Sequence, residues 1–187
     1  QIYDEHIFMF SASSISKIFK RYDFYLVDAI PQITHGGSMR YIIKRKPISG
    51  RHEIEKIYDF EKKNKIDSIE SCKIFKKNCE ISKEKILNKI LDFKGKGKSI
   101  CGYAATSKST TILNYCKIGS NYIDYICDTT KEKIGKYSPG MHIPIKDMDF
   151  FHSNLRDCIY LFAWNHKEEI LNKEKNFKGE WFSHVEI

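Results

Sequence analysis

Short apolar runs alternate with helical segments over residues 98–187, and this alternation is the strongest constraint on how the chain can fold. Each run is short, apolar and bounded by glycine, proline or polar residues, which is typical of buried strands. The predicted strands are residues 99–103, 122–127, 157–164 and 181–187, and the predicted helices between them are residues 110–116 and 167–176. Strands that alternate with helices favour a mostly parallel sheet with crossover helices. We therefore predict an α/β fold, Rossmann-like, with helices flanking the sheet.

A small helix-plus-hairpin element is predicted to precede this domain. Ser11 can cap a helix over residues 11–21, and residues 24–30 and 38–44 read as two antiparallel strands. Residues 52–93 then contain neither proline nor glycine and carry apolar residues at helical spacing, which predicts one long helix or two successive helices. The predicted organisation is a linker element with the hairpin at 1–50, a helical segment at 51–97 and the Rossmann-like domain at 98–187.

The net charge of +8 raises the question of an anionic partner. Much of the excess lysine lies between Lys56 and Lys98, where glutamates are interspersed, and a solvated helix surface explains that pattern. A nucleic-acid-binding face is the alternative. The sequence contains neither an RNA-binding aromatic signature nor zinc-finger spacing, so we do not expect nucleic acid as the partner.

Six cysteines are present, and no two of them form a C-x-x-C pair, so no structural metal site is expected. Cys101, Cys127 and Cys158 lie inside apolar runs and read as core residues of a reduced, cytoplasmic protein. No apolar run approaches the roughly 20 residues of a membrane span, so no membrane association is expected. Because the chain opens at Gln1 without an initiator methionine, we interpret it as part of a longer polypeptide.

Candidate ligand-binding segments follow three predicted strands: residues 102–110, 128–130 and 164–166. In open α/β sheets, ligands bind outside the carboxyl ends of the strands. The first segment combines a helix start, four hydroxyl side chains and Lys108, and these groups suit a diphosphate. It matches neither a P-loop nor a dinucleotide fingerprint. An ordinary capped helix start explains the same residues, and the sequence leaves both readings open.

Two further segments contain candidate functional histidines. His35 precedes Gly36-Gly37, where a hairpin bend with an exposed histidine is the alternative to a binding role. His6 follows Tyr3 and Glu5, and a histidine near a carboxylate and a phenol can transfer protons near neutral pH.

Several motifs occur together in a fixed order along nearly the whole chain. They are Tyr3-Asp4-Glu5-His6, Thr34-His35-Gly36-Gly37-Ser38-Met39-Arg40, Gly102-Tyr103-Ala104-Ala105 through Lys108, Thr111-Ile112-Leu113-Asn114-Tyr115, Tyr137-Ser138-Pro139-Gly140-Met141-His142-Ile143-Pro144-Ile145 and Leu161-Phe162-Ala163-Trp164-Asn165. In these motifs the chain resembles the C-terminal region of the sugar-nucleotide C-methyltransferases. Those enzymes transfer a methyl group from S-adenosylmethionine to a carbon of a deoxy-ketosugar carried on a nucleoside diphosphate.

The resemblance implies a longer enzyme in which separate domains bind the cofactor and the substrate. The family has a zinc-binding N-terminal module, a central Rossmann domain for S-adenosylmethionine and a C-terminal domain for the nucleotide sugar, and only the last is expected here. His6 is then the expected general base, with Glu5 tuning it and Tyr3 positioning substrate. The expected substrate-binding residues are His35, Tyr103, Thr106, Ser107, Lys108, Asp128, His142 and Asn165.

Three positions depart from the family pattern. The family usually has histidine where Asp4 stands, and glycine where Ala104 and Ser109 stand. A Cβ atom limits how closely backbone can approach a phosphate. Two alternative functions remain: a non-catalytic nucleotide- or anion-binding module, which needs only the Lys108 loop and the basic charge, and a nucleic-acid-associated protein that uses the helical lysines.

Overall fold

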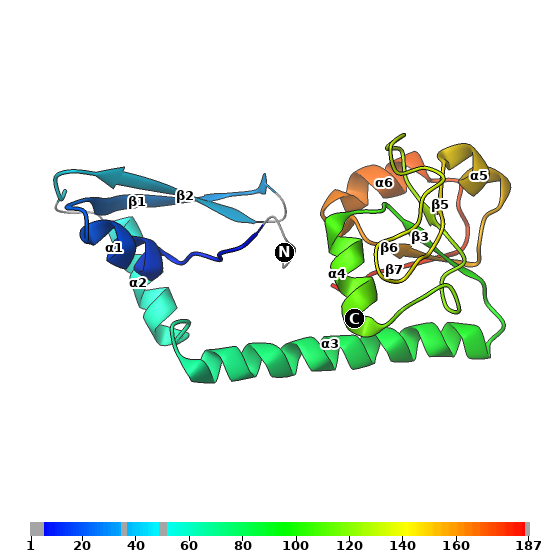
Figure 1. Cartoon of the computed structure of the whole chain (residues 1–187), viewed down its shortest axis with the longest axis horizontal. Helices are drawn as coiled ribbons and strands as arrows, with labels where there is room; N and C mark the ends of the chain where they lie inside the picture. The colour runs from blue at the N-terminus through cyan, green and yellow to red at the C-terminus, as the bar shows by residue number, and fades with distance from the viewer. Residues whose placement is uncertain (1–5, 35–36, 49–51, 186–187) are drawn as a thin grey trace. The chain divides into compact units, whose positions relative to one another are not determined.

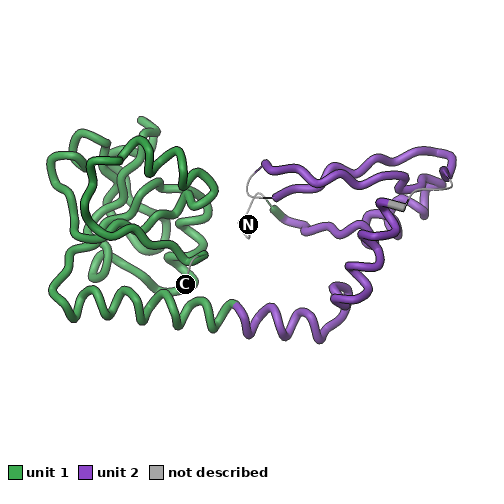
Figure 2. Tube along the Cα trace, turned by 180° about the vertical axis from the view of Figure 1, so that it is seen from behind, with its two compact units in different colours: residues 1–6, 79–187 green, residues 7–78 purple. Residues whose placement is uncertain are grey.

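The computed structural model describes residues 6–34, 37–48 and 52–185. The chain divides into two compact units, and the boundary between them lies within one long helix (Figure 2). Unit 1 comprises residues 1–6 and 79–187, and unit 2 comprises residues 7–78.

Unit 2 contains the predicted helix and hairpin. Helix α1 (Ala12–Lys20) begins at a capping box in which the Ser11 side chain accepts from the Ser14 backbone, as the serines at its start predicted. Strands β1 (Tyr25–Gln32) and β2 (Ser38–Lys44) pair antiparallel, which confirms the predicted hairpin. Helix α2 (His52–Lys63) is joined to α1 by Glu61, whose carboxylate accepts from the Ala12 and Ser13 N–H groups at 2.6 and 2.8 Å.

The lysine-rich stretch forms two successive helices. Helix α2 ends at Lys63, and α3 (Ile69–Gly95) follows after a turn in which Lys65 has φ 50°. The Ser71 hydroxyl donates to the carbonyl of Lys65 at 2.6 Å and fastens this turn. Only the second half of α3 is buried, at Ile86, Ile90 and Phe93, so most of its lysines face solvent as predicted.

The sheet of unit 1 is parallel throughout. Among the described residues it has five strands in the order β5-β4-β3-β6-β7. Their bounds are β3 Ile100–Tyr103, β4 Ile126–Cys127, β5 Ile145–Lys146, β6 Cys158–Leu161 and β7 Glu180–Phe182. This arrangement confirms the predicted α/β, Rossmann-like fold.

Helices cover both faces of the sheet (Figure 1). The second half of α3 and helix α4 (Ser107–Cys116) pack on one face, where Ile90 and Leu113 are completely buried. Helices α5 (Met148–Ser153) and α6 (Lys167–Lys173) pack on the other, through Phe151 and Ile170. Burial of apolar side chains on both faces explains why the strands are continuous apolar runs.

Several boundaries differ from the sequence prediction. Helix α4 begins at Ser107, three residues before the predicted start at residue 110, and Thr106 is its N-cap. The strand predicted at 157–164 ends at Leu161, and Trp164–His166 forms a short 3-10 helix. Strand β5 and helix α5 were not predicted, because a two-residue strand and a six-residue helix are too short for a periodic pattern.

The cysteines behave as predicted. All six are free thiols, and Cys101, Cys127 and Cys158 are fully buried in the strands. Burial raises the pKa of the Cys101 thiol to about 12, which keeps it protonated and unreactive. Within the described ranges, no helix has the length and apolar character that crossing a membrane requires.

Candidate functional site

The side on which the chain adds new strands switches at the centre of the sheet. The chain enters the sheet at β3, adds β4 and β5 on one side, and then adds β6 and β7 on the other. The loops that follow β3 and β6 therefore leave in opposite directions. A crevice outside the carboxyl ends of such strands is where open α/β sheets bind ligands.

The loop after β3 leads into a well-capped helix. The Thr106 side chain accepts from the Ser109 N–H at 3.1 Å, and the Ser109 hydroxyl donates to the Thr106 carbonyl at 2.6 Å. The first turn of an α-helix leaves N–H groups without intrahelical acceptors, and its dipole favours an anion there. The N–H groups of Ser107 and Lys108 are therefore directed toward the crevice end of α4, where an anion can accept from them.

Lys108 links the two loops across the crevice. Its ammonium donates to Oδ1 of Asn165 at 2.9 Å and lies 5.2 Å from the centre of the Trp164 ring. Two residues that are 57 positions apart in the chain thus meet where the side of strand addition switches. The structure brings together four of the predicted binding residues here: Thr106, Ser107, Lys108 and Asn165.

Asp128 holds the loop after β3 in place. This carboxylate is buried and accepts from the Ala105 N–H at 2.7 Å and from the Thr130 N–H at 2.8 Å. The Lys133 ammonium donates to the Ala105 carbonyl at 2.8 Å and lies 3.5 Å from the Asp128 carboxylate. Asp128 therefore supports the turn, whereas the sequence prediction placed it on the substrate. Lys133 was not predicted, although it lies in the same strand-end loop.

Ala104 adopts a left-handed backbone conformation with φ 73°. Glycine adopts this region without a Cβ penalty, whereas an L-residue is strained there. Ala104 is one of the positions where the resembling family usually has glycine, and the backbone angle gives the physical reason for that preference. The clamp formed by Asp128 and Lys133 holds the adjacent Ala105 on both its N–H and carbonyl groups.

His184, which sequence reasoning missed, lies just after β7 at the same edge of the sheet. Burial, and to a lesser extent nearby positive charge that includes Lys108, lowers the pKa of His184 to about 4, so this histidine is neutral at pH 7. Its Nδ1 atom is buried and has no hydrogen-bond partner within the described part of the chain.

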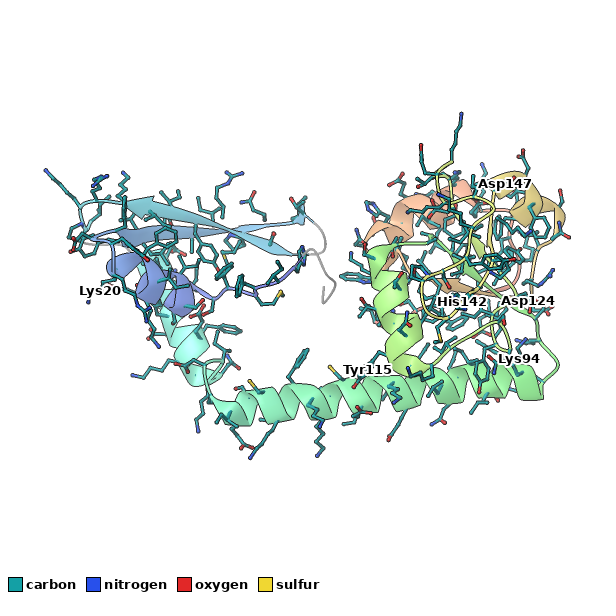
Figure 3. All side chains as sticks on the ribbon, in the orientation of Figure 1. Lys20, Lys94, Tyr115, Asp124, His142 and Asp147 are labelled. Carbon is teal, nitrogen blue, oxygen red and sulfur yellow. The ribbon has the colours of Figure 1, made fainter. Side chains whose placement is uncertain are left out.

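Tyr103 and His142 are not brought into this cluster. The Tyr103 ring is buried on the α5–α6 face, and its hydroxyl donates to Oε1 of Glu174 at 3.0 Å. His142 is exposed and lies in the loop before β5 (Figure 3). The His142 N–H donates to the Ser138 carbonyl at 2.9 Å, which is a backbone contact within this loop.

Of the three predicted catalytic residues, the structure describes His6. His6 is partly buried, while Tyr3 and Glu5, together with the binding residue His35, lie outside the described residues. Among the residues described, no group of three or more His, Cys, Asp or Glu side chains is arranged to hold a metal ion.

The loop after β3 does not fit S-adenosylmethionine. A cofactor turn of this type needs glycines that let the backbone approach the ligand, and Gly102 is the only glycine near this turn. Gly102 is instead required for close packing within the sheet, because a Cβ atom there would lie 2.6 Å from Cε2 of Phe162 and 3.0 Å from Cγ1 of Ile126.

A parallel α/β sheet with helices on both faces, and a lysine–asparagine bridge where the side of strand addition switches, defines a domain of the Rossmann-like class. Residues 33–185 match the family described as the C-methyltransferase C-terminal domain, and the chain belongs to that family. It is 29% identical over 180 residues to the C-methyltransferase NovU of Streptomyces niveus. That alignment covers 94% of this chain and 42% of the relative, so the chain spans less than half of the relative's length.

Proposed function

We propose that this chain is the substrate-binding part of an enzyme that transfers a methyl group from S-adenosylmethionine to a carbon of a nucleoside-diphosphate keto-deoxysugar. Membership of the C-methyltransferase C-terminal domain family and the likeness to a C-methyltransferase support methyl transfer. The single structural observation that carries the substrate assignment is the bridge between Lys108 and Asn165 beside the start of α4.

The diphosphate is the part of such a substrate that this site suits best. Its negative charge matches the N–H groups and dipole at the start of α4 and the ammonium of Lys108. Asn165 orients that ammonium, and the Trp164 ring beneath it adds a cation–π contact. The clamp on Ala105 keeps the turn rigid, so little ordering of the backbone is needed on binding.

Proton transfer is proposed for the beginning of the chain. His6 would remove a proton from the carbon beside the keto group, which leaves an enolate whose carbon can accept a methyl group. Glu5 would orient His6, and Tyr3 would hold the substrate or the enolate oxygen. A well-placed base contributes about 10²–10⁴-fold to the rate.

S-adenosylmethionine would be held by another part of the same polypeptide, since the turn after β3 lacks the glycines for it. The proposed partners of this chain are thus the nucleotide sugar and the remaining domains of its own enzyme. The buried, free thiols are consistent with a cytoplasmic enzyme.

Calorimetric titration with a nucleoside-diphosphate sugar tests this proposal. We expect Lys108→Met to weaken binding at least tenfold, because one charge-assisted contact to phosphate is lost. Lys175→Met, which removes an exposed lysine beyond α6, is the matched control and should bind like the unaltered chain. Equal affinity of the Lys108→Met and unaltered chains, or binding to a short oligonucleotide alone, would contradict the proposal.

A further inference from the structure

A groove runs along the side of α4 that faces the loop between β4 and β5. It has a volume of about 340 Å³, which lies at the lower end of the range for ligand pockets of about 300–1,000 Å³. Its α4 wall includes Thr106, Ser107 and Thr110, and its loop wall includes Lys133 and Lys136. Because Ser107 lines the groove and also begins α4, the groove opens at the proposed diphosphate site.

The loop wall of this groove is held by its own hydrogen bonds. The Ile145 N–H donates to the Lys136 carbonyl at 2.8 Å, and Tyr137 forms a bridge with Pro144. From α4, the Asn114 side chain donates to the Pro139 carbonyl at 2.9 Å. Loop and helix are thus joined directly, so the groove exists before any ligand arrives.

The walls supply an aromatic face beside cationic and polar groups. Tyr137 lines the groove and is 64% exposed, so its ring is free to receive a planar partner. Lys133 and Lys136 supply positive charge, and Glu132 supplies an acceptor for hydroxyl or ring N–H groups. Stacking on an aromatic side chain does not depend on base identity, because every base has a π-face.

We infer that this groove binds the nucleoside of the substrate, with the base stacked on Tyr137. The inference rests on the proposed function, since it begins from a diphosphate at the start of α4. It also assigns a direction to the substrate. The sugar then lies on the opposite side of that helix start, toward the second hollow of about 480 Å³ lined by residues 164–169.

Calorimetry with three simple ligands separates the contribution of the nucleoside to the binding affinity from that of the phosphates. The unaltered chain is titrated with inorganic pyrophosphate, uridine diphosphate and adenosine diphosphate. We expect at least one nucleoside diphosphate to bind at least fivefold more tightly than pyrophosphate, which is the low end of the gain from stacking one base.

Three variants assign that gain to the groove. Tyr137→Ala should abolish it while leaving pyrophosphate affinity unchanged, and Tyr137→Phe should retain it because the ring remains. Tyr22→Ala, at an exposed tyrosine of unit 2, is the matched control and should behave like the unaltered chain.

Each remaining result counts against the inference. If nucleoside diphosphates and pyrophosphate bind equally, and Lys108→Met weakens both, the groove does not bind the nucleoside while the proposed diphosphate site stands. If a nucleoside gain survives in Tyr137→Ala, the base lies elsewhere. If none of the three ligands binds, both the inference and the proposed function fail.

Discussion

The ammonium of Lys108 lies 2.9 Å from Oδ1 of Asn165, and this hydrogen bond joins the loops that follow β3 and β6. These loops diverge because the chain adds strands first on one side of β3 and then on the other. The bond therefore spans the position where parallel α/β sheets open a ligand crevice.

Replacing Asn165 tests whether this bond positions the lysine for a ligand. In Asn165→Ala the ammonium loses its acceptor, so we expect affinity for the nucleotide sugar to fall about tenfold, as for the loss of one charge-assisted hydrogen bond. The free energy of unfolding should change by less than about 1 kcal/mol, because the pair is only partly buried. Calorimetry and urea denaturation measure the two effects, with Asn172→Ala on the exposed side of α6 as the control. Unaltered affinity would show that Asn165 does not act through Lys108.

Removing the carboxylate of Asp128 should destabilise unit 1. Asp128→Ala leaves the Ala105 and Thr130 N–H groups without their acceptor and removes the carboxylate that lies 3.5 Å from the Lys133 ammonium. A buried N–H group that is left without its acceptor costs about 1–3 kcal/mol. Urea denaturation should show this loss, and Asp149→Ala, at an exposed carboxylate of α5, should not. A change in the free energy of unfolding below about 1 kcal/mol would mean that the turn is stable without the Asp128 carboxylate.

Ala104→Gly should relieve backbone strain at φ 73°. The left-handed conformation costs an L-residue about 1–2 kcal/mol, whereas the greater freedom of glycine in the unfolded chain offsets about 0.4–1 kcal/mol of that gain. We therefore expect the free energy of unfolding to rise by roughly 0–1.6 kcal/mol. Ala105→Gly, next to it, should instead lower stability, since φ of Ala105 is not in the left-handed region. Equal effects of the two changes would argue against strain at Ala104.

Stability should depend on pH through His184. Its pKa is about 4 in the folded chain and about 6.5 when unfolded, so between these values the unfolded state binds more protons. The stabilisation is fully present above about pH 6.5 and is lost as pH falls toward 4, by at most about 3 kcal/mol. His184→Gln cannot titrate, so the difference between the two pH profiles of unfolding isolates this residue. A constant difference from pH 7 to pH 4 would contradict the assignment.

Particular residues show how far sequence reasoning reached. Thr106, Ser107 and Lys108 were predicted as binding residues because they follow an apolar strand and begin a helix, and the structure places them at the start of α4. Asn165 was predicted in the same way, after the strand that the structure describes as β6. Asp128 was predicted as a strand-end residue, but its hydrogen bonds to Ala105 and Thr130 could not be read from spacing alone.

The positions of other residues could not be predicted, because they depend on contacts between segments that are distant in sequence. His184 lies beyond the last strand, and only the order of β3, β6 and β7 in the sheet brings it near Lys108. Tyr103 appeared to belong to the binding loop, yet side chains alternate along a strand, and its ring lies on the α5–α6 face.

The amino-acid sequence alone determined the class of fold, the hairpin with its preceding helix, and the helix start that can accept an anion. These features depend on local periodicity, capping and turn residues, which act over a few neighbouring positions. The tertiary structure alone decided which loops meet, which strand-end side chains face the crevice and which are buried beneath it. Strand order and side-chain packing set those relationships, and neither is encoded in the spacing of residues along the chain.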